Sequence, residues 1–215
     1  MASITFDDGY ANQYQNGRPL LNARGLKATY YLIGDAFSWS GHMNGTMAQQ
    51  LASEGNELGN HTMNHPNLTT LSASQTATEF ANAQSAIIAQ TGVTPTTCAY
   101  PYGASNSTVT NTAAQYFKAC RTTDGGLNTA ANYAPYSLKM FYVLSNTTAA
   151  QVQAAAANAK ATNSWVIFVY HGVTPGTPSS TYDVSATNLA AQLDAIKSTN
   201  IPVYTVAGAL AAVGK

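Results

Sequence analysis

The sequence predicts an α/β fold in which parallel strands close, or nearly close, into a barrel. Short apolar runs alternate with longer amphipathic runs, which is the pattern of parallel βαβ units. About seven or eight runs have strand character, enough to close a barrel, although an open doubly wound sheet remains an alternative. Reactive side chains directly follow several of these strands, where barrels place their active sites.

The strand candidates are short apolar runs bounded by turn residues. They lie at residues 4–7, 28–33, 56–59, 97–100, 117–122, 138–144, 165–170 and 202–206. A length of 215 residues without an internal repeat or a linker-like segment predicts one domain over residues 1–215.

The clearest helix candidates lie between these strands, at residues 47–53, 74–91, 148–161 and 186–199. In the last of them, Leu189, Leu193 and Ile196 recur at helical spacing, which predicts one apolar face. Ser72 and Ser74 both precede the long middle helix, and either can cap its first turn.

Charged residues are scarce in this chain, at 8% of the sequence against about 25% in ordinary soluble domains. The net charge is zero, which argues against a nucleic-acid partner, because such a partner requires a basic face. No run reaches the roughly 18 apolar residues of a membrane span, so we expect no membrane partner. A surface of Asn, Gln, Ser and Thr suits an extracellular protein that meets neutral polymers such as glycans.

Five of the predicted strands end on a reactive residue or on a Pro-Tyr-Gly turn. These runs are ITF-DD, NELG-NH, TCAY-PYG, ACR-TTD and VIFVY-H. A core without a catalytic purpose would finish mainly on turn residues. The pattern therefore indicates an active site at the carboxyl ends of the strands.

Two pairs of residues together predict a metal site. Asp7-Asp8 alone is most often a turn that closes on Gly9, and His61 and His65 alone can be a coincidence of spacing. Combined, they supply a carboxylate and two imidazoles, a familiar open site for Zn²⁺ or a similar ion. Because the chain turns at the strand end, the second carboxylate can reach the same pocket and stay free to take a proton from water.

Four segments resemble motifs of the NodB-homology polysaccharide deacetylases, carbohydrate esterase family 4. TFDDG is similar to the first motif, HTMNH to the second and YPYG to the end of the third, and VYH stands in the place of the fifth. The resemblance extends over essentially the whole chain. It implies a distorted (β/α) barrel of about seven parallel strands, with the whole chain as one catalytic domain.

The resemblance also implies roles for individual residues. Asp7 is the implied catalytic base, His171 the implied general acid, and the backbone N–H of Tyr102 an oxyanion donor. The implied metal ligands are Asp8, His61 and His65. The implied reaction is metal-assisted hydrolysis of an acetyl group, with Zn²⁺ as the expected cofactor and Co²⁺ or another divalent transition metal as alternatives.

Two motifs depart from the family pattern. The third motif commonly begins with an arginine that braces the catalytic aspartate, and this chain has Cys98 there. The fourth motif, with acidic residues and a tryptophan, is missing, and its region is ACRTTDGGLNT. We expect Arg121, at the end of the next strand, to orient Asp7 instead; the alternative is an ordinary salt bridge, for example to Asp124.

Three residues are expected to contact the substrate: Pro101, Tyr102 and Val169, the last in place of a leucine that lines the acetyl-methyl pocket in the family. The segment GVTPGTPSSTYDVS follows the fifth motif and is expected to be a loop at the active-site face. Tyr182 and Asp183 in this loop are further candidates for sugar contact, with an ordinary loop role as the alternative.

Cys98 and Cys120 hold comparable positions in successive strand candidates. If those strands pair, a disulfide is geometrically feasible, and two buried free thiols are the open alternative. Neither cysteine is expected to be catalytic, because no histidine is adjacent in sequence and the metal scheme does not require a thiol.

The favoured function is removal of N-acetyl groups from a GlcNAc-containing polymer such as chitin, poly-N-acetylglucosamine or peptidoglycan. The third-motif arginine is also missing from some deacetylases of that kind. The alternatives are an O-acetyl xylan esterase and, in another class, a carbohydrate-binding protein of the same fold with little turnover. We expect a secreted monomer from which a signal peptide has been removed, with a polysaccharide or oligosaccharide substrate.

Overall fold

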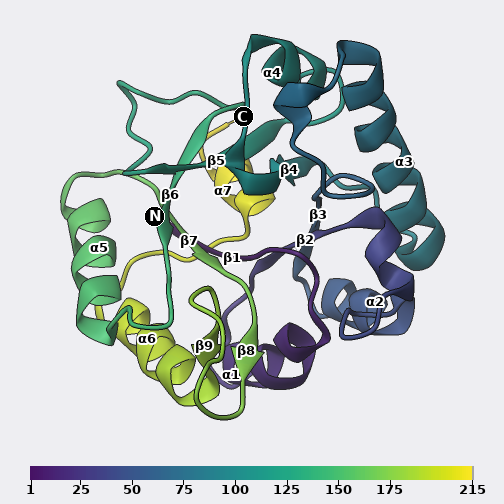
Figure 1. The fold of residues 1–215 in the computed structure, drawn as a ribbon. Coiled ribbons are helices and arrows are strands. Elements are labelled where there is room, and N and C mark those ends of the chain that lie inside the picture. The colour runs from purple at the N-terminus through teal and green to yellow at the C-terminus, as the bar shows by residue number, and fades with distance from the viewer. Residues whose placement is uncertain (215) are drawn as a thin grey trace.

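Residues 1–214 are described by a computed structural model in which seven parallel strands close into a barrel. The strands are β1 (Ala2–Phe6), β2 (Thr29–Leu32), β3 (Glu57–Asn60), β4 (Thr97–Ala99), β5 (Ala119–Gly125), β6 (Leu138–Tyr142) and β7 (Val166–Tyr170). Because β1 pairs with both β2 and β7, the sheet has no open edge at its first strand (Figure 1). The predicted barrel is confirmed, and the open doubly wound sheet is excluded.

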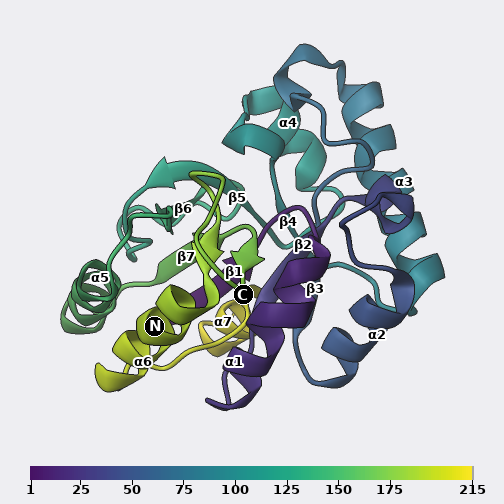
Figure 2. The same cartoon turned by 60° about the horizontal axis from the view of Figure 1, so that its bottom comes forward.

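Helices surround the barrel (Figures 1 and 2). The four predicted helices are confirmed as α2 (Gly45–Ser53), α3 (Ala73–Thr91), α5 (Ala149–Ala161) and α6 (Ala186–Ser198). Three shorter helices were not predicted: α1 (Arg18–Asn22), α4 (Ser107–Ala113) and α7 (Val206–Ala212). Each of these has at most seven residues, which is too short to display a clear apolar period in the sequence.

The prediction of an eighth strand at residues 202–206 is wrong. Only Val203 forms a bridge there, to Ala2 at the start of β1. The side chain of Thr205 then accepts a hydrogen bond from the N–H of Gly208 and caps α7. Since β1 already pairs on both sides within the closed barrel, no sheet edge is left for an eighth strand.

Helix α7 closes one end of the barrel and is seen within the ring of strands in Figure 1. Its residues Val206 and Leu210 belong to the same buried cluster as Ile167 and Val169 of β7. Residues 173–174 and 184–185, predicted as loop, form the short parallel strands β8 (Val173–Thr174) and β9 (Val184–Ser185). This pairing joins the two ends of the loop that follows β7.

The disulfide alternative for the two cysteines is the correct one. Cys98 of β4 and Cys120 of β5 are register partners and are joined by a disulfide. Both residues are fully buried on the outer side of the barrel, in a cluster with Phe80, Val109 and Phe117.

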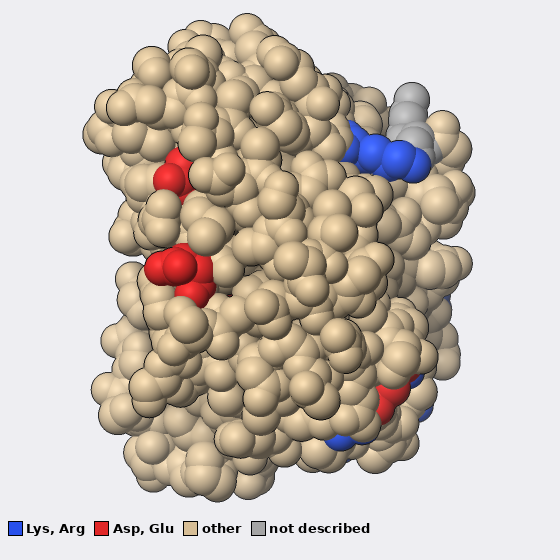
Figure 3. All heavy atoms as spheres, turned by 90° about the vertical axis from the view of Figure 1, so that its right-hand side faces the viewer, with Lys and Arg blue, Asp and Glu red and all other residues tan. Residues whose placement is uncertain are grey.

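The surface carries few charges, and uncharged atoms dominate the face shown in Figure 3. Two surface ion pairs, Arg18–Glu54 and Arg24–Asp194, hold α1 near the end of α2 and near α6. Over residues 1–214, every helix is too short or too polar to cross a membrane.

Helix α3 provides a test of the local sequence signals. Ser72 caps it in a reciprocal capping box with Gln75, whereas the hydroxyl of the other candidate, Ser74, makes no hydrogen bond among the described residues. We expect Ser72→Ala to lower the free energy of unfolding by about 1 kcal/mol, because a helix N–H loses its acceptor. In a chain of this size that corresponds to a fall in Tm of about 2–4 °C.

The matched control is Ser74→Ala, which we expect to change stability by less than about 0.5 kcal/mol. Both variants are compared by thermal and urea unfolding. Equal losses in the two variants would contradict the assigned cap.

Candidate active site

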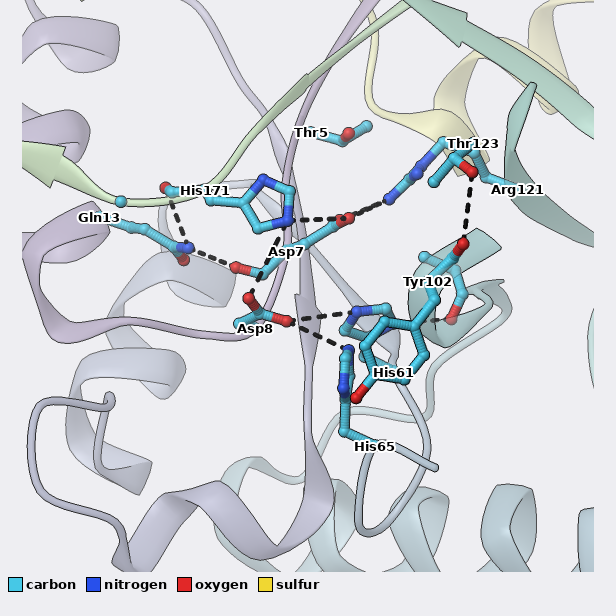
Figure 4. Close-up of polar contacts among 12 residues, drawn as sticks. Thr5, Asp7, Asp8, Gln13, His61, His65, Tyr102, Arg121, Thr123 and His171 are labelled. Atoms are coloured by element: carbon cyan, nitrogen blue, oxygen red, sulfur yellow. Dashed lines mark hydrogen bonds and ion pairs between the residues drawn. The ribbon is translucent and has the colours of Figure 1, made fainter. Parts of the chain in front are cut away.

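Four reactive residues continue the inward face of their strands. Side chains alternate between the two faces of a strand, and the odd-numbered positions of β1, β3, β5 and β7 face the barrel interior, as in the inward contact of Ser3 with Trp165. Asp7, His61 and His171 are the next inward positions after β1, β3 and β7, and Arg121 is an inward position of β5. The side chains therefore converge at the carboxyl end of the barrel (Figure 4).

Arg121 and Asp7 form a buried ion pair. The Nη2 atom of Arg121 lies 2.5 Å from each carboxylate oxygen of Asp7, and Arg121 is only 1% exposed. Its guanidinium also lies over the ring of Tyr31, 5.4 Å from the ring centroid. Asp124 is exposed and is not the partner of Arg121, so the predicted contact with Asp7 is present and the alternative pair is not.

The charges around Asp7 keep it ionised although it is buried. Burial alone would raise the pKa of this carboxyl, but Arg121, His61 and His171 together hold its pKa below the ordinary value. A carboxylate at this position is therefore available as a proton acceptor at neutral pH.

Asp8, His61 and His65 form a cluster that can hold a metal ion. Oδ1 of Asp8 lies 3.4 Å from Nε2 of His61 and 3.5 Å from Nε2 of His65, and one ligand atom from each residue falls within 4.8 Å of the others. Nδ1 of His61 lies 2.7 Å from the carbonyl oxygen of Ala99. If this Nδ1 carries the proton, Nε2 is left with a free lone pair toward Asp8, as metal-ligating histidines require.

The pKa shifts in this cluster follow from its close packing: burial would lower the pKa of His61, but its contact with Asp8 and the charges of Asp7 and Asp8 raise it. Burial would raise the pKa of Asp8, but its hydrogen bond to His61 and the nearby imidazoles lower it well below the usual range. Burial and the neighbouring His61 lower the pKa of His65 to about 4. His65 is therefore neutral at physiological pH, which is the form that binds a metal.

The backbone at the site adopts conformations that residues other than glycine rarely take. Four of the six non-glycine residues with positive φ among residues 1–214 belong to the site: Asp8 (71°), Thr62 (67°), His65 (57°) and Tyr102 (60°). Such conformations cost about 1–3 kcal/mol each and persist where surrounding contacts enforce them. At Asp8 the turn allows two adjacent carboxylates to reach one pocket, as expected from the sequence.

Local hydrogen bonds hold the turn that carries the two histidines. The side chain of Asn60 accepts a hydrogen bond from the N–H of Thr62, whose hydroxyl accepts one from the N–H of His65. Glu79 of α3 accepts hydrogen bonds from two further N–H groups of this turn. The imidazole of His65 is thus placed by side chains on both the turn and a helix.

The Pro101–Gly103 turn lies beside the cluster. The ring of Tyr102 contacts His65 with its centroid 4.7 Å from the imidazole, and 67% of Tyr102 is exposed. Gly103 follows at φ 68°, and a Cβ atom there would lie 2.4 Å from the backbone nitrogen of Thr123. Only glycine allows this turn to pack so closely against β5.

His171 faces both carboxylates from the opposite side. Its Nε2 lies 3.9 Å from Oδ2 of Asp7 and 4.0 Å from Oδ2 of Asp8. The imidazole packs against the rings of Tyr142 and Tyr182, at centroid distances of 5.7 and 5.6 Å. Its buried Nδ1 has no hydrogen-bond partner among residues 1–214.

Gln13 links the ends of β1 and β7, and no pattern in the sequence predicted this role. Its buried amide donates hydrogen bonds to the backbone oxygens of Asp7, at 2.5 Å, and of His171, at 3.2 Å. The residue lies in a five-residue π-helical turn before α1, which has no recognisable pattern in the sequence.

These groups border an open cavity of about 570 Å³. Its lining residues are Asp7, Asp8, Tyr10, His61, His65, Tyr100, Tyr102, Gly103, Thr123, Tyr142, Leu144, His171, Ser180, Tyr182 and Asp183. Of the residues expected to contact substrate, Tyr102 lines the cavity, whereas Pro101 and Val169 do not. Val169 is an inward residue of β7 one alternation below His171, so it lies in the buried core under the site.

Tyr10, Tyr142 and Leu144 line the cavity and were not predicted as site residues. Tyr142 ends β6 and Leu144 follows shortly after it, so the rule that strand ends carry the site applies to them. None of the three carries an ionic charge or an imidazole, so nothing in the sequence distinguishes them from ordinary core residues. Tyr182 and Asp183 do line the cavity, as the loop assignment suggested.

Comparisons with known proteins agree with this arrangement. The family model described as polysaccharide deacetylase matches residues 1–117, which include the first three motif segments. The putative polysaccharide deacetylase YxkH of Bacillus subtilis is 32% identical over 103 residues, covering 48% of this chain and 37% of YxkH. The peptidoglycan-N-acetylglucosamine deacetylase PgdA of Listeria monocytogenes is 32% identical over 108 residues, covering 50% of this chain and 22% of PgdA. The chain thus spans well under half of the length of these relatives.

Solved structures share the fold over the whole chain. A family 4 acetyl xylan esterase from Clostridium thermocellum, solved with a cobalt ion, superimposes with a TM-score of 0.69 at 22% identity. The superposition covers 99% of this chain and 91% of that one. The family match, which covers more than half of the chain, and the shared fold together show that this chain belongs to the polysaccharide deacetylases of carbohydrate esterase family 4.

Proposed function

We propose that this chain is a metal-dependent hydrolase that removes N-acetyl groups from a GlcNAc-containing polymer, such as chitin, poly-N-acetylglucosamine or peptidoglycan. One observation carries the proposal: a carboxylate braced by a buried arginine, Asp7, stands directly beside the Asp8–His61–His65 cluster. The named activity of PgdA, an N-deacetylase of GlcNAc residues, supports the choice of an amide substrate.

Asp8, His61 and His65 would hold the ion, and Zn²⁺ is the preferred candidate for one carboxylate and two imidazoles. Co²⁺ is the second candidate, since the structural relative was solved with it. A bound divalent ion supplies Lewis-acid activation of water and of a carbonyl oxygen.

The remaining residues transfer protons or stabilise the charge that develops during the reaction. Asp7, ionised and held by Arg121, takes a proton from the attacking water as general base. The backbone N–H of Tyr102 donates to the oxygen of the acetyl carbonyl as negative charge develops on it. His171 gives a proton to the departing amine, so that acetate and a free amino sugar leave the site.

Two other functions remain as alternatives. An O-acetyl xylan esterase would use the same groups, and the fold shared with the acetyl xylan esterase from Clostridium thermocellum favours keeping it. A carbohydrate-binding protein with little turnover is suggested by the altered third and fourth motifs. The buried Arg121–Asp7 pair counts against that reading, because binding alone does not require a braced, ionised carboxylate.

We further propose that residues 1–215 form one catalytic domain that acts as a monomer outside the cell. The buried disulfide supports the location, because disulfides persist mainly in oxidising compartments. A surface with few charged residues, as on the face in Figure 3, supports an uncharged polymer as the substrate class.

Acetate release from a panel of substrates tests the proposed function. The panel contains chitin oligomers, poly-N-acetylglucosamine oligomers, acetylated peptidoglycan and acetylated xylan, each assayed before chelation, after chelation and after Zn²⁺ or Co²⁺ is restored. We expect metal-restorable release from an amide substrate. Release from xylan alone would establish the esterase, and glycan binding without any release would establish the binding protein.

A metal-binding measurement distinguishes the roles of the two adjacent aspartates. We expect Asp8→Asn to weaken Co²⁺ binding by at least about tenfold, because the substitution removes a charged ligand. Asp7→Asn is the matched control, because we assign Asp7 to proton transfer: it should retain the cobalt absorption spectrum while turnover falls by about 10²–10⁴-fold. Loss of cobalt binding in both variants, or in neither, would contradict the division of roles.

Two substitutions of Arg121 test its role: one removes the positive charge, and the other keeps the charge but changes the geometry. We expect Arg121→Gln to lower kcat by about 100-fold, because Asp7 loses its partner and its fixed position. The kcat of Arg121→Lys should lie between that of the parent and that of Arg121→Gln, because an ammonium keeps the charge without the guanidinium geometry. Removing one partner of a buried pair costs about 3–5 kcal/mol of stability, so all assays are run well below each variant's Tm. Unchanged turnover in Arg121→Gln would remove Arg121 from the mechanism.

A further inference from the structure

We infer that the Cys98–Cys120 disulfide positions the active site, because it fixes the two strands from which Arg121 reaches Asp7 and the Ala99 carbonyl reaches His61. The sulfur atoms themselves lie outside the cavity, on the other face of the barrel wall. The disulfide therefore acts through its neighbours and is a positioning element rather than a catalytic group. This inference rests on the proposed function of Asp7 and His61.

The disulfide lies one residue from both contacts. Cys98 and Cys120 are register partners in the parallel ladder, and the next register pair is Ala99 with Arg121. The carbonyl oxygen of Ala99 meets Nδ1 of His61 at 2.7 Å, and Nη2 of Arg121 meets the carboxylate of Asp7 at 2.5 Å. The disulfide is thus adjacent both to Ala99, which orients the candidate metal ligand His61, and to Arg121, which orients the candidate base Asp7.

β4 and β5 pair with each other over three consecutive register pairs, but the ladders that join them to their other neighbours are short or irregular. β4 has only three residues, and its pairing with β3 consists of the single register pair Asn60 with Cys98. On the other side, the pairing of β5 with β6 shifts register directly after Arg121, between Arg121 and Gly125. The disulfide adds a covalent link to the ladder between β4 and β5, next to the position where a movement of β5 relative to its neighbours would displace Arg121.

The guanidinium of Arg121 lies over the ring of Tyr31 and hydrogen-bonds to only two residues. Nη1 donates to the adjacent carbonyl of Thr122, and the hydrogen bonds of Nη2 within residues 1–214 go to Asp7 alone. Nε is buried without a hydrogen-bond partner among residues 1–214. With no third residue hydrogen-bonding the guanidinium, a displacement of β5 is transmitted directly to the carboxylate of Asp7.

The location of the disulfide makes the restraint permanent. Both cysteines are fully buried beneath α3 and α4, among Phe80, Val109 and Phe117. A buried disulfide is inaccessible to thiols in the folded protein, since exchange requires access to a sulfur atom. It is therefore a fixed structural link within the native state.

A double-mutant cycle with Arg121 tests the inference. The disulfide is removed by Cys98→Ala with Cys120→Ala, both in the parent chain and in Arg121→Gln, and kcat and KM are measured well below each Tm. We expect kcat in the parent chain to fall about tenfold with KM nearly unchanged, because Asp7 and Arg121 lose alignment. In the Arg121→Gln chain the same removal should lower kcat by a clearly smaller factor than in the parent chain, since the route through Arg121 is already lost and only the route from Ala99 to His61 is left.

Two controls separate positioning from general destabilisation. Val109→Ala makes a cavity in the same buried cluster without touching the ladder, and it should lower Tm while leaving kcat unchanged. If the double alanine variant does not fold, Cys98→Val with Cys120→Ala refills part of the lost volume and is assayed in its place.

The cobalt absorption spectrum of the disulfide-free chain gives a readout that does not depend on activity. We expect its bands to shift, because the carbonyl of Ala99 no longer holds His61 in one orientation. Equal losses of kcat in the two Arg121 backgrounds, or no loss in the parent, would overturn the inference. If the parent chain releases no acetate from any substrate, the proposed function fails, and the spectrum alone then decides the inference: an unchanged spectrum rejects it.

Discussion

The buried contact between Arg121 and Asp7 is the interaction on which the rest of the site depends. Removing a carboxylate from water is costly, and Asp7 remains ionised because a fully buried guanidinium and two nearby imidazoles compensate for the lost hydration. The contact joins β5 to the end of β1, across the mouth of the barrel. It therefore sets both the charge of the candidate base and its distance from the Asp8–His61–His65 cluster.

The closed barrel brings the site residues together, and turns with positive φ values set the detailed positions of their side chains. Asp7, His61 and His171 follow inward positions of separate strands, so closing the sheet is enough to bring them together. Asp8 and Tyr102 have positive φ values at the mouth of the barrel, and Gly103, directly after Tyr102, packs closely against Thr123. The free energy gained by packing the barrel core thus offsets the cost of a few unfavourable backbone conformations at its mouth.

The departure from the third motif of the family and the presence of Arg121 on the next strand are related. The position where the family commonly has its arginine holds Cys98, whose disulfide partner immediately precedes Arg121 on the next strand. The guanidinium still reaches Asp7, from β5 rather than from β4. Nδ1 of His171 has no hydrogen-bond partner among residues 1–214, and the rings of Tyr142 and Tyr182 pack against the imidazole.

The sequence by itself determined the seven barrel strands, the four longer helices and the motif residues Asp7, Asp8, His61, His65 and His171, because apolar periodicity and short motifs are local properties of the chain. It also suggested Arg121 as the partner of Asp7, from the absence of any arginine before the Pro-Tyr-Gly turn. Only the tertiary structure decided that residues 202–206 do not form a strand, that Cys98 and Cys120 are bonded, and that Gln13, Tyr10 and Tyr142 belong to the site. These outcomes depend on barrel closure, on register and on contacts between residues far apart in the chain, none of which leaves a periodic signal in the sequence.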